Sequence, residues 1–171
     1  MSTDGCDRIL VAGIGNVFLA DDGFGSEVAQ LLARGPIPHG VEVADIGIRG
    51  VHLAFQLLDG YDAAILIDTM PHGEPPGTVT VIEHVPSDRS DDPEAATAQR
   101  DAHGMQPDVV LSLLDDLGGA VRLVLIIGCE PAELEPRMGL SSVVEAAVAP
   151  AAAAVLDLIN RLRSGALVDR R

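Results

Sequence analysis

Five short segments of the chain carry hydrophobic patterns that are typical of β-strands. Three of them, Arg8–Ala12 (RILVA), Ala63–Ile67 (AAILI) and Arg122–Ile127 (RLVLII), are nearly continuous apolar runs. Such runs indicate strands buried on both faces, as in a parallel sheet covered by helices. Val41–Ile46 and Thr78–Ile82 instead alternate apolar and polar residues. We expect the second of these, which follows a Pro-Pro-Gly turn, to be an antiparallel or edge strand.

Between these segments, apolar residues recur with the spacing of an α-helix. Apolar residues recur at Phe24, Val28, Leu31 and Leu32, and a Gly-Pro step at 35–36 would end that helix. Further helices are predicted over three segments: Val51–Leu58, Asp108–Leu117, and a last one from Ser141 or Ser142 to about Arg163.

Strands that alternate with helices predict an α/β fold, a three-layer α/β/α sandwich around a mostly parallel sheet of about five strands with one antiparallel strand. We assign residues 1–171 to a single domain, with 164–171 as a loose tail. Ser142-x-x-Glu145 fits a capping box at the start of the last helix.

The segment from Pro86 to about Gln106 shows neither the helical nor the strand spacing of apolar residues. So long a connection within a compact domain is usually functional or disordered. We expect this polar, acidic segment to be mobile in the free protein and ordered when a partner binds.

Composition determines what the core is made of and which partners are excluded. Hydrophobic residues make up 47% of the chain and aromatic residues only 2%, so Val, Leu, Ile and Ala must build the core. Lys and Arg number 11 against 26 Asp and Glu, a formal net charge of −15. Nucleic acid and anionic membranes repel such a surface, whereas a protein with a basic patch is steered towards it.

Compartment and redox state follow from the cysteines and the first residues. Cys6 and Cys129 lie far apart, which argues against a thiolate zinc site and a disulfide framework. The first residues are polar and acidic, unlike a signal peptide. No apolar run approaches the ~18 residues of a membrane span. We therefore expect a soluble, cytoplasmic protein, and a monomer.

Two glycines after the first strand suggest a nucleotide site, but the rest of the pattern is absent. A dinucleotide-binding G-x-G-x-x-G needs a third glycine after Gly13 and Gly15, at the position of Phe18. The following helix also begins too late to hold a pyrophosphate at its N-terminus. The chain has no Walker sequence and no G-x-S-x-G serine-hydrolase signature.

The whole segment from Gly13 to Gly25 (GIGNVFLADDGFG) is more specific. It resembles the opening motif of the nickel–iron hydrogenase maturation proteases, G-x-G-N-x-x-x-x-D-[DE]-x-x-G. The resemblance covers nearly the whole chain and continues in four places: Asp45–Gly50 (DIGIRG), Ala64–Asp68 (AILID), the His103-Gly104 step, and Gly128–Pro131 through Leu134–Ser141.

The resemblance implies an aspartic-type endopeptidase that cuts a C-terminal extension from a hydrogenase large-subunit precursor after nickel insertion. It also implies that Asp22, Asp68 and His103 are the catalytic and metal-contacting residues, since they match the family's trio position by position. The nickel would be carried by the substrate. Another divalent ion, such as zinc or cadmium, could occupy the same positions in the isolated protein.

The residues themselves support the same grouping. Asp22 follows the first predicted strand and Asp68 ends another, so both carboxylates should point towards one edge of the sheet. His103 lies on the long connection that could fold over this edge. Two carboxylates and an imidazole suit a divalent metal, but such a set does not choose strongly between nickel, zinc and other ions.

Each carboxylate also has a simpler explanation. Asp21 is expected to be a helix N-cap, a position that favours Asp. Asp22 could be a favourable charge in the first helical turn, and Asp68 could cap the next segment.

Other candidate groups compete with His103 or lie near the predicted site. His72 is its main competitor, because it follows Asp68 by four residues. Cys129 and Glu130 follow the third apolar run and should lie close by, although Cys129 has no basic partner to make it a nucleophile. Three histidines are interpreted as ordinary surface residues: His39, His52 and His84.

Two functions from other classes stay open at this point. A non-catalytic nickel metallochaperone would use the same trio without cutting a precursor. A nucleotide-binding α/β module would use the turn from Gly13 to Asn16 and no metal.

Overall fold

The computed structural model describes residues 5–85 and 107–167. Within these ranges, five strands form one sheet in the order β2-β1-β3-β5-β4. Neighbouring strands from β2 to β5 pair in parallel, whereas β4 runs antiparallel to β5 at the sheet edge. The predicted mostly parallel sheet with one antiparallel strand is therefore confirmed. The strands are β1 (Ile9–Ile14), β2 (Val41–Gly47), β3 (Ala63–Thr69), β4 (Val79–Glu83) and β5 (Leu123–Cys129).

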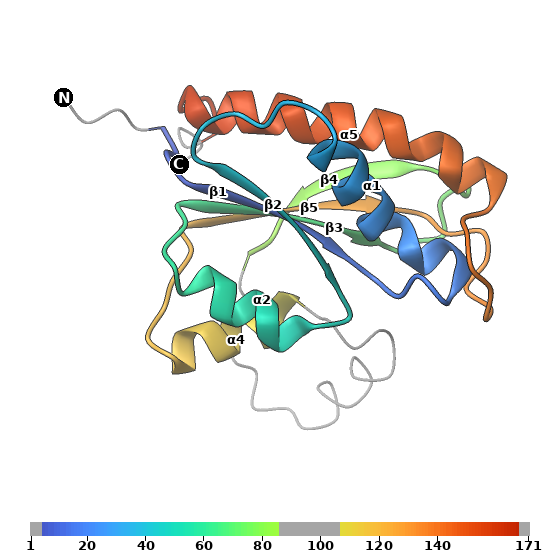
Figure 1. The fold of residues 1–171 in the computed structure, drawn as a ribbon, viewed down its shortest axis with the longest axis horizontal. Coiled ribbons are helices and arrows are strands. Elements are labelled where there is room, and N and C mark those ends of the chain that lie inside the picture. Colours follow the sequence, from blue (N-terminus) through green and yellow to red (C-terminus); the bar gives the residue numbers. More distant parts are fainter. Residues whose placement is uncertain (1–4, 86–106, 168–171) are drawn as a thin grey trace.

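Helices cover both faces of this sheet (Figure 1). On one face lie α1 (Phe24–Ala33) and the long α5 (Ser142–Arg163), and on the other lie α2 (Gly50–Leu57) and α4 (Pro107–Asp116). A short 3-10 helix, η1 (Ala20–Gly23), joins β1 to α1. These layers confirm the α/β/α sandwich. The predicted segment from Pro86 to Gln106 lies outside the described residues.

The continuous apolar runs are explained by two cores, one on each side of the sheet. All six residues of β1 are buried. Alternate positions on a strand face opposite ways, so Val11 joins the core under α1 and α5 while Leu10 joins the core under α2 and α4. Phe24 and Tyr61 are the buried aromatic residues of the described chain, and aliphatic side chains supply the rest of the cores.

The last helix corrects one expectation. Among the described residues, α5 is long and apolar enough to cross a membrane by length and composition, with a mean hydropathy of 1.8 over an 18-residue window. The expectation that no apolar run approaches this length is therefore wrong for α5. Its buried residues recur every three or four positions, as at Val144, Ala147, Ala151 and Val155, and pack onto the sheet. This core packing explains the apolar residues on the buried face of α5, which make up 39% of that window.

One edge of the sheet gathers the ends of four strands. Because β1, β2, β3 and β5 are parallel, their carboxyl ends meet there, and Val79 at the start of β4 pairs with Cys129 at the end of β5. In such folds this edge is where sites are built. The strand β3 runs two residues further than predicted, so Asp68 is its penultimate residue and Thr69 its last.

Candidate active site

Close packing of α1 on the sheet brings η1 to the carboxyl edge of β3. A Cβ atom added to Gly25 would lie 2.2 Å from the carbonyl oxygens of both Ile14 and Ile67, so the backbone of α1 lies directly on β1 and β3. Gly15 has a φ of +135°, and a Cβ there would lie 1.8 Å from the carbonyl oxygen of Asp22. Gly15, one of the two glycines that resembled part of a nucleotide motif, therefore allows the chain to pack closely against Asp22.

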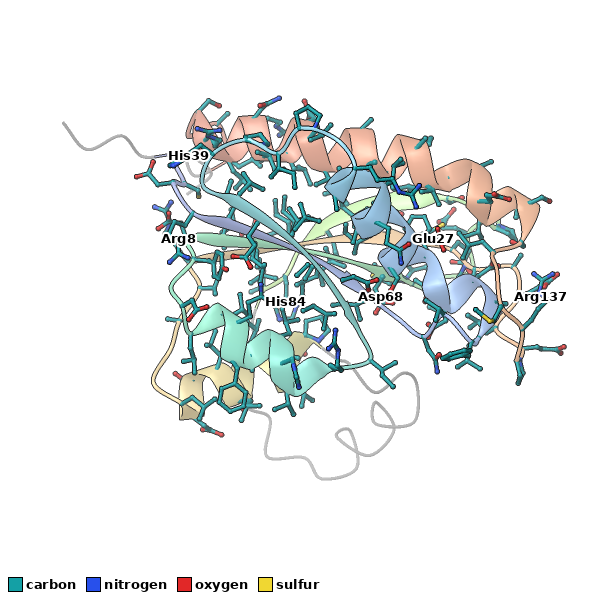
Figure 2. The ribbon with its side chains drawn as sticks, in the orientation of Figure 1. Arg8, Glu27, His39, Asp68, His84 and Arg137 are labelled. Atoms are coloured by element: carbon teal, nitrogen blue, oxygen red, sulfur yellow. The ribbon has the colours of Figure 1, made fainter. Side chains whose placement is uncertain are left out.

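The two predicted carboxylates meet at Thr69. Asp22, in η1, is only 5% exposed; its Oδ2 accepts the backbone N–H of Asn16 at 2.9 Å, and its Oδ1 accepts the Thr69 hydroxyl at 3.0 Å. Asp68 is partly buried, and its Oδ1 accepts the backbone N–H of Thr69 at 2.7 Å. Figure 2 shows Asp68 at the carboxyl end of β3, beneath α1. The structure thus places Asp22 and Asp68 together, at the sheet edge where the sequence predicts them.

Electrostatics distinguish Asp68 from an ordinary surface carboxyl group. Burial raises the pKa of Asp68 to about 8, and the charge of Asp22 acts in the same direction. The backbone N–H and the hydroxyl of Thr69 oppose this rise by stabilising the ionised form. With such a pKa, Asp68 holds its proton at neutral pH unless a cation lies beside it. A metal ion brought to this edge would favour the carboxylate.

Asp21 has a structural role that differs from the expected N-cap. Its side chain is fully buried and accepts hydrogen bonds from the backbone N–H groups of Ala132 (2.8 Å), Glu133 (2.8 Å) and Ser141 (2.6 Å), and from the Ser141 hydroxyl (2.9 Å). Burial by itself would raise the pKa of Asp21, but these backbone and side-chain hydrogen bonds lower it below its ordinary value. Through these hydrogen bonds, Asp21 holds the segment 132–141 against η1.

The N-cap expectation fails because the chain enters α1 through a 3-10 turn. Leu19 is the N-cap of η1 and Gly23 that of α1, which leaves Asp21 inside the turn with its carboxylate facing the segment 132–141. The predicted capping box at Ser142 and Glu145 is also wrong. The N-cap of α5 is Ser141, and its hydroxyl bonds Asp21 instead of capping α5.

The histidine of the predicted trio, His103, lies outside the described residues. Its competitor His72 has an exposed side chain, and its backbone N–H donates to the Glu130 carboxylate at 2.6 Å. His84 lies apart from Asp68 (Figure 2). Its Nε2 is 3.0 Å from the Asp108 carboxylate, but the two groups are not aligned as a hydrogen bond. The side chains of His39 and His52 are exposed, as expected for surface residues.

Cys129 is a buried thiol at the end of β5. Burial raises its pKa to about 11, and the charges of Asp21 and Glu130 push it in the same direction. Its Sγ lies 3.7 Å from the carbonyl oxygen of Glu130. At neutral pH such a group stays a thiol, which agrees with the sequence-based argument against a nucleophilic cysteine.

The Asp22–Asp68 pair does not by itself complete a metal site. In the part of the chain that the structure describes, no three His, Cys, Asp or Glu side chains come together closely enough to hold a metal ion. Two carboxylate groups are nevertheless suitable donors for a divalent ion that brings its own ligands. Sequence reasoning missed Thr69, although its position directly after Asp68 was a signal that could have identified it.

Comparisons with known proteins identify the family. The family model described as hydrogenase maturation protease matches residues 26–158. The hydrogenase expression/formation protein HupM of Azotobacter chroococcum is 36% identical over 161 residues, covering 92% of this chain and 74% of that protein. The hydrogenase 2 maturation protease of Escherichia coli is 30% identical over 156 residues, covering 90% of this chain and 91% of that protein.

Solved structures show the same relationship. The hydrogenase maturating endopeptidase HybD from Escherichia coli superimposes with a TM-score of 0.72 at 29% identity, covering 90% of this chain and 93% of that one. A hydrogenase 2 maturation peptidase from a Thaumarchaeota archaeon gives a TM-score of 0.68 at 33% identity, covering 90% and 98%. This chain therefore belongs to the hydrogenase maturation protease family and is a peptidase, which is a hydrolase.

Proposed function

We propose that this peptidase removes the C-terminal extension of the large-subunit precursor of a nickel–iron hydrogenase after nickel has been inserted. The observation that carries the proposal is the Asp22–Asp68 pair, two buried or partly buried carboxyl groups that share Thr69 as a hydrogen-bond donor at the carboxyl edge of the sheet. The nickel in this proposal belongs to the substrate.

The Asp22–Asp68 pair is suited to recognise a precursor that carries nickel. Nickel held by the precursor's cysteines would present a cation with open positions to Asp22, Asp68 and His103, and so fix the scissile bond against the enzyme. Burial raises the pKa of Asp68 to about 8, and an approaching cation would make its carboxylate form favourable. One of the two carboxylates then takes the proton from the attacking water as a general base.

The absence of a ready nucleophile among residues 5–85 and 107–167 agrees with this water-based mechanism. The Cys129 thiol has its pKa raised to about 11, and the chain has no G-x-S-x-G serine. An attack by activated water is therefore preferred to a covalent acyl intermediate.

The test is to incubate the protein with nickel-loaded and nickel-free precursor and to measure both products by intact mass spectrometry. We expect only the loaded precursor to lose its C-terminal extension. Equal cleavage of both forms would contradict recognition through the metal. An unchanged mass for both would contradict the endopeptidase and favour a metallochaperone. A thermal-shift screen with nucleotides serves as a control, and no stabilisation is expected.

A further inference from the structure

We infer that Thr69 is the positioning residue that holds the two carboxylates of this site in one fixed arrangement, an inference that rests on the proposed role of Asp22 and Asp68. Thr69 is the last residue of β3 and is only 6% exposed. Its backbone N–H donates to Asp68 Oδ1 at 2.7 Å, and its hydroxyl donates to Asp22 Oδ1 at 3.0 Å. One residue thus binds both carboxyl groups.

The geometry of β3 explains why the residue after Asp68 can do this. Successive side chains on a strand point to opposite faces of the sheet. Ile67 belongs to the core under α1 and α5, so Thr69, two residues later, faces the same layer, from which η1 carries Asp22. Asp68 lies between them on the other side of the strand, and its carboxylate turns back to the Thr69 backbone. Asp68 therefore accepts the backbone N–H of Thr69, whereas Asp22 accepts its hydroxyl.

The Thr69 hydroxyl links two segments of the chain that are 47 residues apart. Asp22 Oδ2 is fixed separately by the backbone N–H of Asn16, so the hydroxyl fixes its other oxygen and thereby the plane of the carboxylate. Threonine also has few χ1 rotamers because it is β-branched, which keeps its hydroxyl aimed at Asp22.

This arrangement predicts different effects for two substitutions at the same position. Thr69→Val keeps the branched shape but removes the hydroxyl donor. Thr69→Ser keeps the donor but removes the methyl group. If Thr69 only filled space, valine would be the milder change. If it positions Asp22, serine would be the milder change. Thr78→Val is the matched control, because it removes a hydroxyl that donates to the Pro75 carbonyl oxygen and contacts no carboxylate of the site.

The experiment measures kcat and KM on nickel-loaded precursor, and the affinity of the isolated protein for Cd²⁺ by titration calorimetry. For Thr69→Val we expect kcat and Cd²⁺ affinity to fall roughly 10–100-fold, as for other residues that orient metal ligands, with KM within about twofold. Thr69→Ser should recover most of both losses, and Thr78→Val should change neither. Circular dichroism verifies that each variant is folded.

Wild-type kcat and Cd²⁺ affinity in Thr69→Val would overturn the inference, as would a serine variant no better than valine. If Thr69→Val does not fold, the serine variant decides. A loss of Cd²⁺ affinity in Thr69→Ser as large as that in Asp22→Asn would contradict a role for the hydroxyl. If wild-type protein does not cleave the precursor, the proposed function fails. The Cd²⁺ comparison still tests Thr69, and a wild-type protein that binds no Cd²⁺ would overturn the inference as well.

Discussion

The buried carboxylate of Asp21 accepts both the backbone N–H and the hydroxyl of Ser141, a residue 120 positions further along the chain. It accepts two more backbone N–H groups at Ala132 and Glu133. One side chain therefore ties the segment that leads into α5 to the 3-10 turn that carries Asp22. The stability of the protein and the position of a candidate catalytic group depend on the same contact.

If Asp21 were a helix N-cap, Asp21→Asn would be mild, because asparagine caps a helix about as well as aspartate. The buried contacts of Asp21 predict a larger effect. An asparagine has only one acceptor oxygen, and its NH₂ group would face N–H donors that the carboxylate now satisfies. We expect Asp21→Asn to lower the free energy of unfolding by roughly 1–3 kcal/mol, measured by urea denaturation. Ser141→Ala, which removes only the hydroxyl donor, should cost less. Equal stability of Asp21→Asn and wild type would contradict the structural role.

The pKa of Asp68 is raised, whereas that of Asp21 is lowered, and the raised pKa should make the stability of the protein depend on pH. The pKa of Asp68 is about 8 in the folded protein, against an ordinary value of 3.8, so between about pH 4 and pH 8 the folded state holds a proton that the unfolded state has released. Stability then falls as pH rises through this interval, because ionising Asp68 in its buried place is unfavourable. Below pH 4 this penalty is absent, and above pH 8 it is complete.

Asp68→Asn removes this titration and is the variant that tests it. In the presence of a chelator, we expect Asp68→Asn to be more stable than wild type at pH 8, with a difference that shrinks towards pH 4. Chemical denaturation at several pH values measures both curves. Parallel curves for the two proteins would contradict the raised pKa of Asp68.

Gly25 tests whether the close contact of α1 with the sheet positions the site. Alanine there would place a Cβ 2.2 Å from two backbone oxygens, and backbone moves less readily than a flexible side chain. We expect Gly25→Ala to destabilise the fold by about 1–3 kcal/mol or more and to reduce precursor processing, because η1 would shift away from β3. Gly35→Ala, whose Cβ would meet only Leu32 O at 3.7 Å, is the control and should change little in either assay.

Most of the fold could be predicted because each strand has a periodic or continuous apolar pattern. The run at 63–67 predicted β3, and the alternation at 78–82 predicted the antiparallel edge strand β4. The placement of Asp22 and Asp68 at one edge could also be predicted, because parallel strands end together. These inferences use only local pattern and a topological rule.

The contacts of Asp21 and Thr69 could not be predicted in the same way. The partners of Asp21 lie more than 100 residues away, and nothing local in the sequence distinguishes a buried acceptor from a helix cap. The role of Thr69 depends on η1 being packed onto β3, which follows from the close approach at Gly25. Tertiary packing decides both cases, so local propensity gave an incorrect role for Asp21 and none for Thr69.

The candidate site itself is tested by removing its groups one at a time. Asp22→Asn and Asp68→Asn keep the size of the side chain but remove the charge that a metal or a general base requires. His103→Ala removes an imidazole lone pair. We expect each change to lower precursor processing by about 10²-fold or more, since groups that act as one unit fail together. Asp22→Asn should also cost some stability, because Asp22 is buried and bonded to Asn16 and is not a surface residue.

His72→Ala is the matched control for His103→Ala. The exposed side chain of His72 lies four residues from Asp68 in sequence, but the contact that holds this position is its backbone N–H to Glu130, which alanine preserves. We therefore expect His72→Ala to process the precursor at the wild-type rate and to unfold within about 0.5 kcal/mol of wild type. Processing by each folded variant is measured by mass spectrometry under identical conditions. If His72→Ala abolishes cleavage and His103→Ala does not, His72 is the third group of the site, and it reaches the Asp22–Asp68 pair from the end of β3.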